Sequence, residues 1–121
     1  MKDEQSSDEL QHNGGDQDCI EACTACSQTC LQMAMTHCLE MGGAHAEPSH
    51  MRLMLDCAAV CELAARLQLG ASEFADDFCA LCAEVCLACA DSCDGLEGME
   101  DCAQTCRDCA AQCETRSGMA S

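Results

Sequence analysis

Most cysteines of this 121-residue chain fall in runs, and within each run they follow one another at steps of three or four residues. Because an α-helix turns once every 3.6 residues, side chains at these steps share one face of a helix. The sequence therefore predicts helices whose inward faces carry thiols where a bundle ordinarily carries leucine. The thiols that follow this spacing are Cys19, Cys23, Cys26, Cys30, Cys57, Cys61, Cys79, Cys82, Cys86, Cys89, Cys93, Cys102, Cys106, Cys109 and Cys113.

Capping residues and glycines divide the chain into four helices. Pro48 suits a helix start, Gly70 a helix end, and Ser72 a cap. We expect helices at about 16–41, 48–69, 72–94 and 99–115. Short loops make sequential helices antiparallel, so the predicted fold is all-α, an antiparallel up-down-up-down four-helix bundle with a cysteine-lined core. Residues 1–15 are expected to be a flexible acidic tail, 16–115 the bundle and 116–121 a C-terminal tail.

The net charge of the chain restricts the classes of partner that it can bind. A formal net charge of −17 repels nucleic acid and anionic lipid. No run of 18 apolar residues is present, so no membrane span is expected. The first 18 residues are polar and do not resemble a signal peptide, which favours a cytoplasmic location. A disulfide framework is disfavoured, since neighbouring thiols on one helix are poorly placed to pair.

Methionine and histidine extend the thiol faces toward one end of the bundle. Met33, His37 and Met41 continue the spacing after Cys30, His50 and Met54 precede Cys57, and Met99 precedes Cys102. In an antiparallel bundle these positions meet and form a mouth of thioethers and imidazoles. Methionine also serves as core filler and histidine as a buried hydrogen bonder, and both alternatives stay open. The predicted metal ligands are Met33, His37, Met41, His50, Met54, the cysteines above and Cys38, which lies one residue off the spacing.

The opposite end is expected to be closed by an apolar plug. Large apolar residues gather where the second and third helices meet, and no role is assigned to His12 or His45. The predicted plug consists of Leu63, Leu67, Leu69, Phe74, Phe78 and Leu81.

Soft thiolates select Cu(I), zinc or iron–sulfur clusters. Zinc favours separate four-ligand sites, which continuous thiol faces do not form. Bacterial iron–sulfur motifs carry a Cys-Pro pair, and no cysteine here precedes a proline. Cu(I) accepts two or three sulfurs, and one thiolate per ion leaves no net charge to bury. The pattern thus favours multiple Cu(I) ions, approaching one per cysteine, with protons released on binding.

The chain resembles the copper storage proteins, a family of cysteine-lined four-helix bundles. The segments that carry the likeness are CIEACTACSQTC, HCLEMGGAH, LDCAAVCELA, FCALCAEVCLACADSC and DCAQTCRDCAAQC. The resemblance implies Cu(I) bound along the bore by the regularly spaced cysteines, a homotetramer of bundles, and the cytosolic branch of the family. The second helix departs from the family, with His50 and Met54 where relatives can carry thiols. The loop before the fourth helix lacks the histidines of some relatives.

The predicted function is binding and storage or buffering of multiple Cu(I) ions through cysteine thiolates. No nucleophile–base arrangement and no phosphate-binding loop is found, so an enzyme is not expected. Two other classes stay open: a thiol-redox or iron–sulfur electron-transfer protein, and a zinc-binding structural module.

Overall fold

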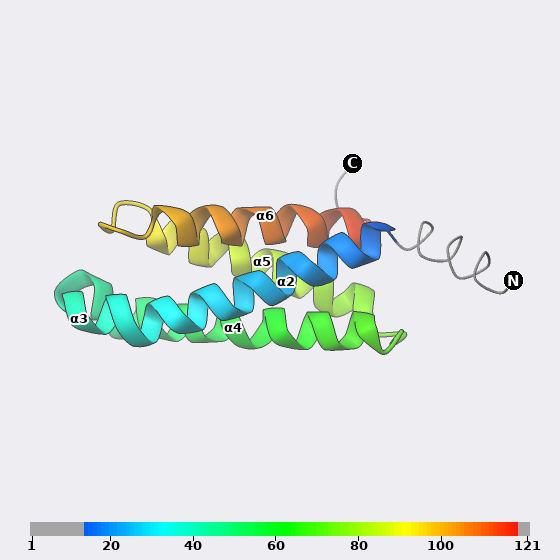
Figure 1. The fold of residues 1–121 in the computed structure, drawn as a ribbon, viewed down its shortest axis with the longest axis horizontal. Coiled ribbons are helices and arrows are strands. Elements are labelled where there is room, and N and C mark those ends of the chain that lie inside the picture. Colours follow the sequence, from blue (N-terminus) through cyan, green and yellow to red (C-terminus); the bar gives the residue numbers. More distant parts are fainter. Residues whose placement is uncertain (1–13, 119–121) are drawn as a thin grey trace, which may run out of the picture.

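The computed structural model describes residues 14–118, which form a rod of helices (Figure 1). No strand occurs within these residues, and the predicted all-α class is confirmed. Residues 1–13 of the expected N-terminal tail lie outside the described residues. Gly14 and Gly15, also expected in the tail, belong to the first described helix. In chain order the elements are α2 (Gly14–Met33), the π-helical turn η1 (Ala34–Cys38), α3 (Leu39–Met41), the 3-10 turn η2 (Gly43–Ala46), α4 (Pro48–Leu69), α5 (Ala75–Cys93) and α6 (Glu100–Ser117).

The long helices pack as an antiparallel bundle. α2, η1 and α3 form one rod that borders α4 and α6, and α5 also borders α4 and α6. Successive rods reverse direction, which confirms the predicted up-down-up-down order (Figure 1). One end gathers α3, η2 and the α5–α6 loop (residues 94–99), and we call it the mouth. The other end, called the far end, gathers the α4–α5 loop and the end of α6.

Most helix boundaries follow from the residues that predicted them. Gly42 ends α3 with φ +66° and ψ −160°, a conformation confined almost entirely to glycine. Pro48 opens α4, and Gly70 follows its last residue. The third helix begins later than predicted, at Ala75, because Ser72 caps a preceding turn, where its Oγ accepts the Phe74 N–H at 3.0 Å. The fourth helix continues past the predicted Thr115 as far as Ser117.

The core is built from small side chains. All sixteen cysteines are buried, and alanines such as Ala64, Ala83 and Ala90 fill the spaces between them. Met54 and Met99 are the only fully buried side chains larger than cysteine among the described residues. Alanine and cysteine let the helices approach closely, but they bury little apolar area per residue.

The predicted apolar plug is wrong. Leu69 is 68% exposed and Phe74 55% exposed, and Leu63 and Leu81 are also exposed. Leu63, Leu69 and Leu81 lie on the outside of α4 and α5, on faces that do not carry the cysteines, and Phe74 lies in the loop just before α5.

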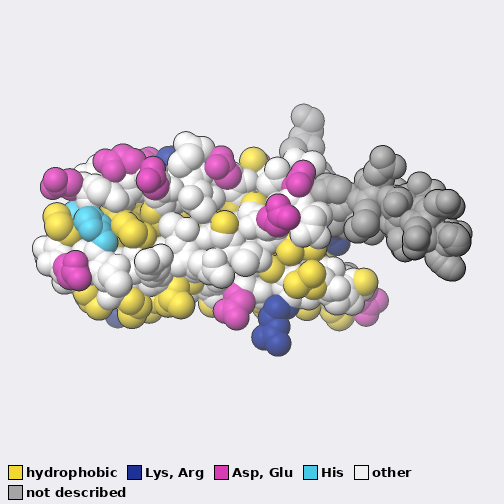
Figure 2. Space-filling view, in the orientation of Figure 1, with side chains coloured by type: hydrophobic (Ala, Val, Ile, Leu, Met, Phe, Trp, Pro, Cys, Tyr) yellow, Lys and Arg dark blue, Asp and Glu magenta, His cyan; other side chains and the backbone are white. Residues whose placement is uncertain are grey.

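Acidic side chains predominate among the charged groups on the face of the molecule seen in Figure 2. Histidine is visible there at the mouth. None of the helices described for residues 14–118 is both long and apolar enough to cross a membrane.

Candidate metal centre

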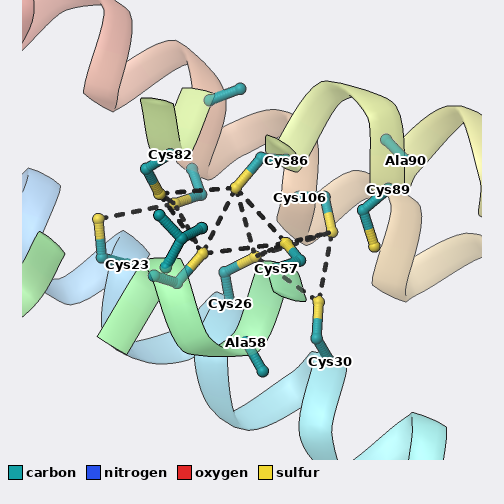
Figure 3. Close-up of a cluster of buried hydrophobic side chains, with 14 of the residues drawn as sticks. Cys23, Cys26, Cys30, Cys57, Ala58, Cys82, Cys86, Cys89, Ala90 and Cys106 are labelled. Carbon is teal, nitrogen blue, oxygen red and sulfur yellow. Dashed lines mark hydrogen bonds between the residues drawn. The ribbon is translucent and has the colours of Figure 1, made fainter. Parts of the chain in front are cut away.

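The middle of the bundle holds a continuous cluster of sulfur atoms (Figure 3). Cys26 Sγ lies 3.9 Å from Cys30 Sγ, 3.8 Å from Cys57 Sγ, 3.9 Å from Cys86 Sγ and 3.7 Å from Cys106 Sγ. These sulfurs come from all four rods. Each gap is short enough for one metal ion at about 2.3 Å from each sulfur to be shared between neighbours.

The thiols form overlapping groups whose sulfur atoms lie within 4.8 Å of one another. Cys61 and Cys86 belong to two such groups, and their own sulfurs are 3.4 Å apart. Shared members mean that the groups are not independent four-ligand sites. The groups are Cys26, Cys30, Cys57 and Cys106; Cys26, Cys57, Cys61 and Cys86; Cys61, Cys82, Cys86 and Cys109; Cys23, Cys82, Cys109 and Cys113; and Cys19, Cys79 and Cys113.

The π-helical turn η1 brings Cys38 into the bore. A π turn bonds residue i to residue i+5 and so adds one residue to the helical turn. The inward face therefore passes from Cys30 through Ala34 to Cys38, and all three are fully buried. The same shift turns Met41 outward, where it is 46% exposed. The expected inward position of Met41 is thus corrected, while Met33 is partly buried and packs against the core.

Cys38 meets a mixed set of donors at the mouth. Its Sγ lies 3.6 Å from His50 Nε2 and 3.9 Å from Met99 Sδ. His50 Nδ1 lies 2.7 Å from Ser92 Oγ, so when Nδ1 carries the proton, Nε2 presents its lone pair to Cys38. A hydrogen-bonded ring of this kind is oriented for a metal ion in the same way as ligating histidines generally.

Met54 continues this donor set toward the middle of the bundle. Its Sδ lies 3.5 Å from Cys89 Sγ and 3.7 Å from Cys93 Sγ. The structure therefore brings together Cys38, His50, Met54 and Met99 near one end of the thiol cluster, as the helical spacing predicted for all except Cys38.

His37 and His45 lie beside this donor set but bind the backbone. The Nε2 atoms of both rings approach the carbonyl oxygen of Glu97, at 2.8 Å and 2.9 Å, and the rings pack edge to face with centroids 5.2 Å apart. His45 is only 7% exposed although it lies in a short turn. The sequence analysis assigned His45 no role. The one sequence feature that could have indicated a role is its position between Gly42 and Pro48, in the loop that closes the mouth.

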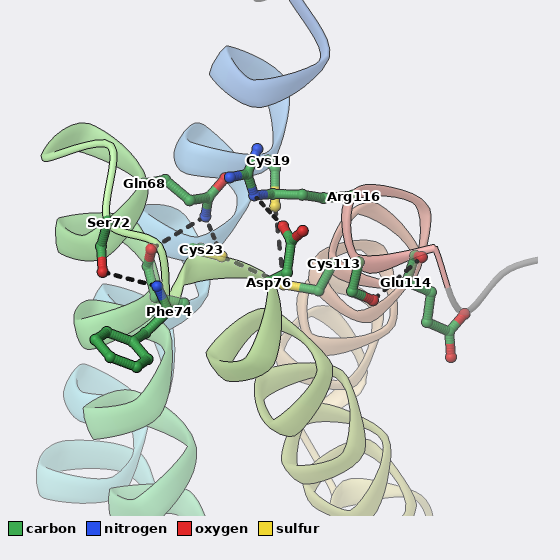
Figure 4. A network of polar contacts seen from close by, with 11 residues as sticks. Cys19, Cys23, Gln68, Ser72, Phe74, Asp76, Cys113, Glu114 and Arg116 are labelled. Carbon is green, nitrogen blue, oxygen red and sulfur yellow. Dashed lines mark hydrogen bonds and ion pairs between the residues drawn. The ribbon is translucent and has the colours of Figure 1, made fainter.

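The far end is closed by polar groups (Figure 4). Gln68 is buried, and its Nε2 donates to Ala64 O at 3.1 Å and contacts Cys23 Sγ at 3.8 Å. Arg116 has a 19% exposed side chain, and its Nε lies 3.4 Å from Asp76 Oδ1. These residues surround Cys19, Cys23 and Cys113 where the plug was expected.

Burial sets the protonation of the isolated donors. It raises the pKa of the Cys38 thiol and lowers the pKa of His50, so both are neutral near pH 7. Inside the cluster, contacts between thiols act in opposite directions on different members. The pKa of Cys26 is lowered, and the hydrogen bond with Cys106 is the largest cause. The pKa of Cys30 is raised, and the hydrogen bond with Cys102 is the largest cause.

These features define a class: a four-helix bundle with a sulfur-lined bore. The sequence pattern of the copper storage protein family matches residues 12–118. The chain belongs to the copper storage protein family, as the resemblance of its cysteine segments predicted.

Solved structures of similar proteins support this assignment. The fold is similar to that of a protein from Nitrosospira multiformis, with a TM-score of 0.87 and 48% identity over 88% of this chain and 98% of that one. It is also similar to the Cu(I)-bound copper storage protein BsCsp3, with a TM-score of 0.77 and 35% identity over 85% of this chain and 98% of that one. The apo form of copper storage protein 3 from Bacillus subtilis gives a TM-score of 0.69 and 37% identity, covering 84% and 97% of the two chains.

A curated relative is similar in sequence. An uncharacterised cysteine-rich protein of Bacillus subtilis, YhjQ, is 40% identical over 75 residues, which are 62% of this chain and 68% of that protein.

Proposed function

We propose that this protein stores Cu(I) in its sulfur-lined bore. The observation that carries the proposal is that all sixteen cysteines are free, buried thiols and that their metal-binding groups share members. Family membership and the similarity to a Cu(I)-bound storage protein support it.

Shared thiols favour Cu(I) over the other soft metals. A bridging thiolate serves two ions, so a continuous cluster fills without isolated sites, whereas zinc needs four separate ligands. Each Cu(I) also cancels the charge of one thiolate, which removes the cost of burying anions. A zinc module or an iron–sulfur protein would need discrete groups of four thiols, and Cys61 and Cys86 each belong to two groups.

The ligands we propose are the sixteen cysteines, with His50, Met54 and Met99 as neutral donors at the mouth. Because a neutral donor binds Cu(I) without losing a proton, these three can accept an ion first and pass it to a thiol. Every thiol that then binds releases its proton, so uptake weakens as the pH falls. Met33, at the edge of the core, is a weaker candidate, and the exposed Met41 is not included.

Titration of the reduced protein with Cu(I) against a chromophoric chelator tests this function. We expect uptake of many equivalents, approaching the number of cysteines. Saturation at one to four would indicate a discrete site and contradict storage. Cys86→Ser, which alters two overlapping groups, should lower the capacity more than Cys79→Ser, which alters only the group at the far end.

We propose that the bundle assembles into a homotetramer, as the family resemblance implies. The exposed apolar side chains of α4 and α5 support self-association, since Leu63, Phe78, Leu81 and Val85 line a groove of about 350 Å³ on that face. Sedimentation equilibrium is expected to give four chains per particle, and Leu63→Glu with Leu81→Glu should give smaller ones. Arg52→Glu, an exposed change on α4, serves as the control.

We also propose that the protein works in the cytoplasm and that its role is not catalytic. Reduced thiols persist in the cytoplasm, and all sixteen must stay reduced to bind Cu(I). Cell fractionation with thiol counting checks the location.

A further inference from the structure

The donors at the mouth are sealed from solvent. Cys38, Met54 and Met99 have no exposed surface, Cys93 and Cys102 are 1% exposed, and His50 is 4% exposed. A metal ion delivered from outside therefore cannot reach them until part of the protein moves.

The α5–α6 loop covers this site. Leu96 packs against the buried core, and Met99, the last loop residue, places its Sδ beside Cys38. The backbone of the loop is held at one point from two other elements, because His37 of η1 and His45 of η2 both bond to Glu97 O. Both histidines would lose this contact if the loop lifted.

We propose that His37 and His45 form a latch that keeps the α5–α6 loop closed over the mouth, and that opening of this latch admits Cu(I). The inference rests on the proposed function, since it assigns a gate to the storage site. In it, the two histidines are positioning residues that control the rate of uptake and leave the capacity unchanged. If His37 were instead a metal-relay ligand, its replacement would slow uptake.

Gly98 allows the latch to be broken without changing a histidine. A Cβ at Gly98 would lie 2.7 Å from His37 Nε2, so Gly98→Ala must displace the ring from Glu97 O. Gly95 is the matched control, because its φ of +85° is close to the +83° of Gly98 and an added Cβ meets nothing within 4 Å. Both variants carry the same backbone strain, and only Gly98→Ala disturbs the latch.

The experiment measures uptake of Cu(I) from its complex with the chromophoric chelator, under anaerobic conditions. We expect Gly98→Ala and His37→Ala to take up the first equivalents about tenfold faster than the wild type, the factor for one hydrogen bond of ordinary strength. Gly95→Ala should match the wild type, and the final capacity should be the same in all variants. Slower or unchanged uptake in Gly98→Ala would overturn the latch.

His37→Gln distinguishes a latch from a ligand. The glutamine amide can donate to Glu97 O from nearly the position of Nε2, but it is a poor ligand for Cu(I). A latch predicts uptake close to the wild-type rate, whereas a relay ligand predicts slow uptake.

Amide hydrogen exchange of residues 95–99 in the metal-free protein gives a readout that needs no copper. It should be faster in Gly98→Ala than in Gly95→Ala, and equal exchange would count against the latch. This readout stays valid if the capacity proves small, so failure of the storage function and failure of the latch remain distinguishable.

Discussion

Loading with Cu(I) is expected to raise the unfolding temperature of this protein by tens of degrees. The metal-free core consists mostly of cysteine and alanine, with Met54 and Met99 as its only larger fully buried side chains among residues 14–118. Such a core gives little hydrophobic stabilisation. Each ion that binds only the folded state adds about 4 kcal/mol when its free concentration is a thousandfold above Kd. In a domain slightly longer than 100 residues, each kcal/mol raises Tm by about 4 °C.

Circular dichroism of metal-free and loaded protein, reduced and anaerobic, measures this shift. Met41→Leu is the matched control, since this exposed methionine should leave the shift unchanged. Cys86→Ser should reduce it, because the change removes a sulfur common to two groups. If loaded and metal-free protein melted together, the ions would be bound outside the folded core.

The architecture was predictable because its determinants are local in sequence. The three- and four-residue spacing predicted the buried face of each helix, and all the regularly spaced cysteines are buried. Pro48, Gly42 and Gly70 mark helix ends through backbone geometry, which depends little on the surroundings.

The mouth was less predictable because a change of helical register occurs within it. Extending a 3.6-residue period past Cys30 selects Met33, His37 and Met41, whereas the π turn selects Ala34 and Cys38. Nothing in the periodicity of one helix shows where its hydrogen bonds shift to i+5. The sequence clue was Cys38 itself, a thiol one residue off the spacing.

Long-range contacts account for the other differences. The role of His45 depends on a carbonyl 52 residues further along the chain, and no local pattern encodes that contact. The far end was expected to be apolar because leucine and phenylalanine cluster near the α4–α5 loop. Gln68 and Arg116 close it instead. Gln68 lies one helical turn after the buried Ala64, and Arg116 lies one turn after the buried Cys113, so both continue the inward faces of their helices.

Alkaline pH is expected to unfold the metal-free protein while the Cu(I)-loaded form stays folded. Hydrogen bonding with Cys113 lowers the pKa of the Cys79 thiol, but Cys19 and burial raise it, and the result is a pKa of about 11. Burial likewise raises the pKa of Cys38 above the ordinary thiol value of 9.0. Contacts between other thiols lower the pKa of some, such as Cys26, and raise that of others, such as Cys30, so the expectation rests on Cys38 and Cys79.

The stability of the metal-free protein falls with rising pH because the unfolded chain loses these protons before the folded protein does. Below pH 9 these thiols are protonated in both states, and the stability they contribute is fully present. Between pH 9 and pH 11 the unfolded thiols ionise while Cys79 stays protonated, so stability falls by about 1.4 kcal/mol per pH unit for each such thiol. Cys79 alone accounts for about 2 kcal/mol by pH 11, a sizeable part of the roughly 5–15 kcal/mol typical of a small domain.

Urea unfolding at pH 8, 9, 10 and 11 measures this loss in the metal-free protein. Cys79→Ser should make the decline of stability with pH shallower. Unfolding of this variant releases one proton fewer, since serine does not ionise in this range. In the loaded form the thiolates carry copper in place of protons, so its stability should not fall over the same interval. Constant or rising stability of the metal-free protein above pH 9 would mean that the thiols already exist as thiolates in the empty bore. Copper would then displace no protons on binding, and its affinity would not weaken at lower pH in the way a bore of neutral thiols requires.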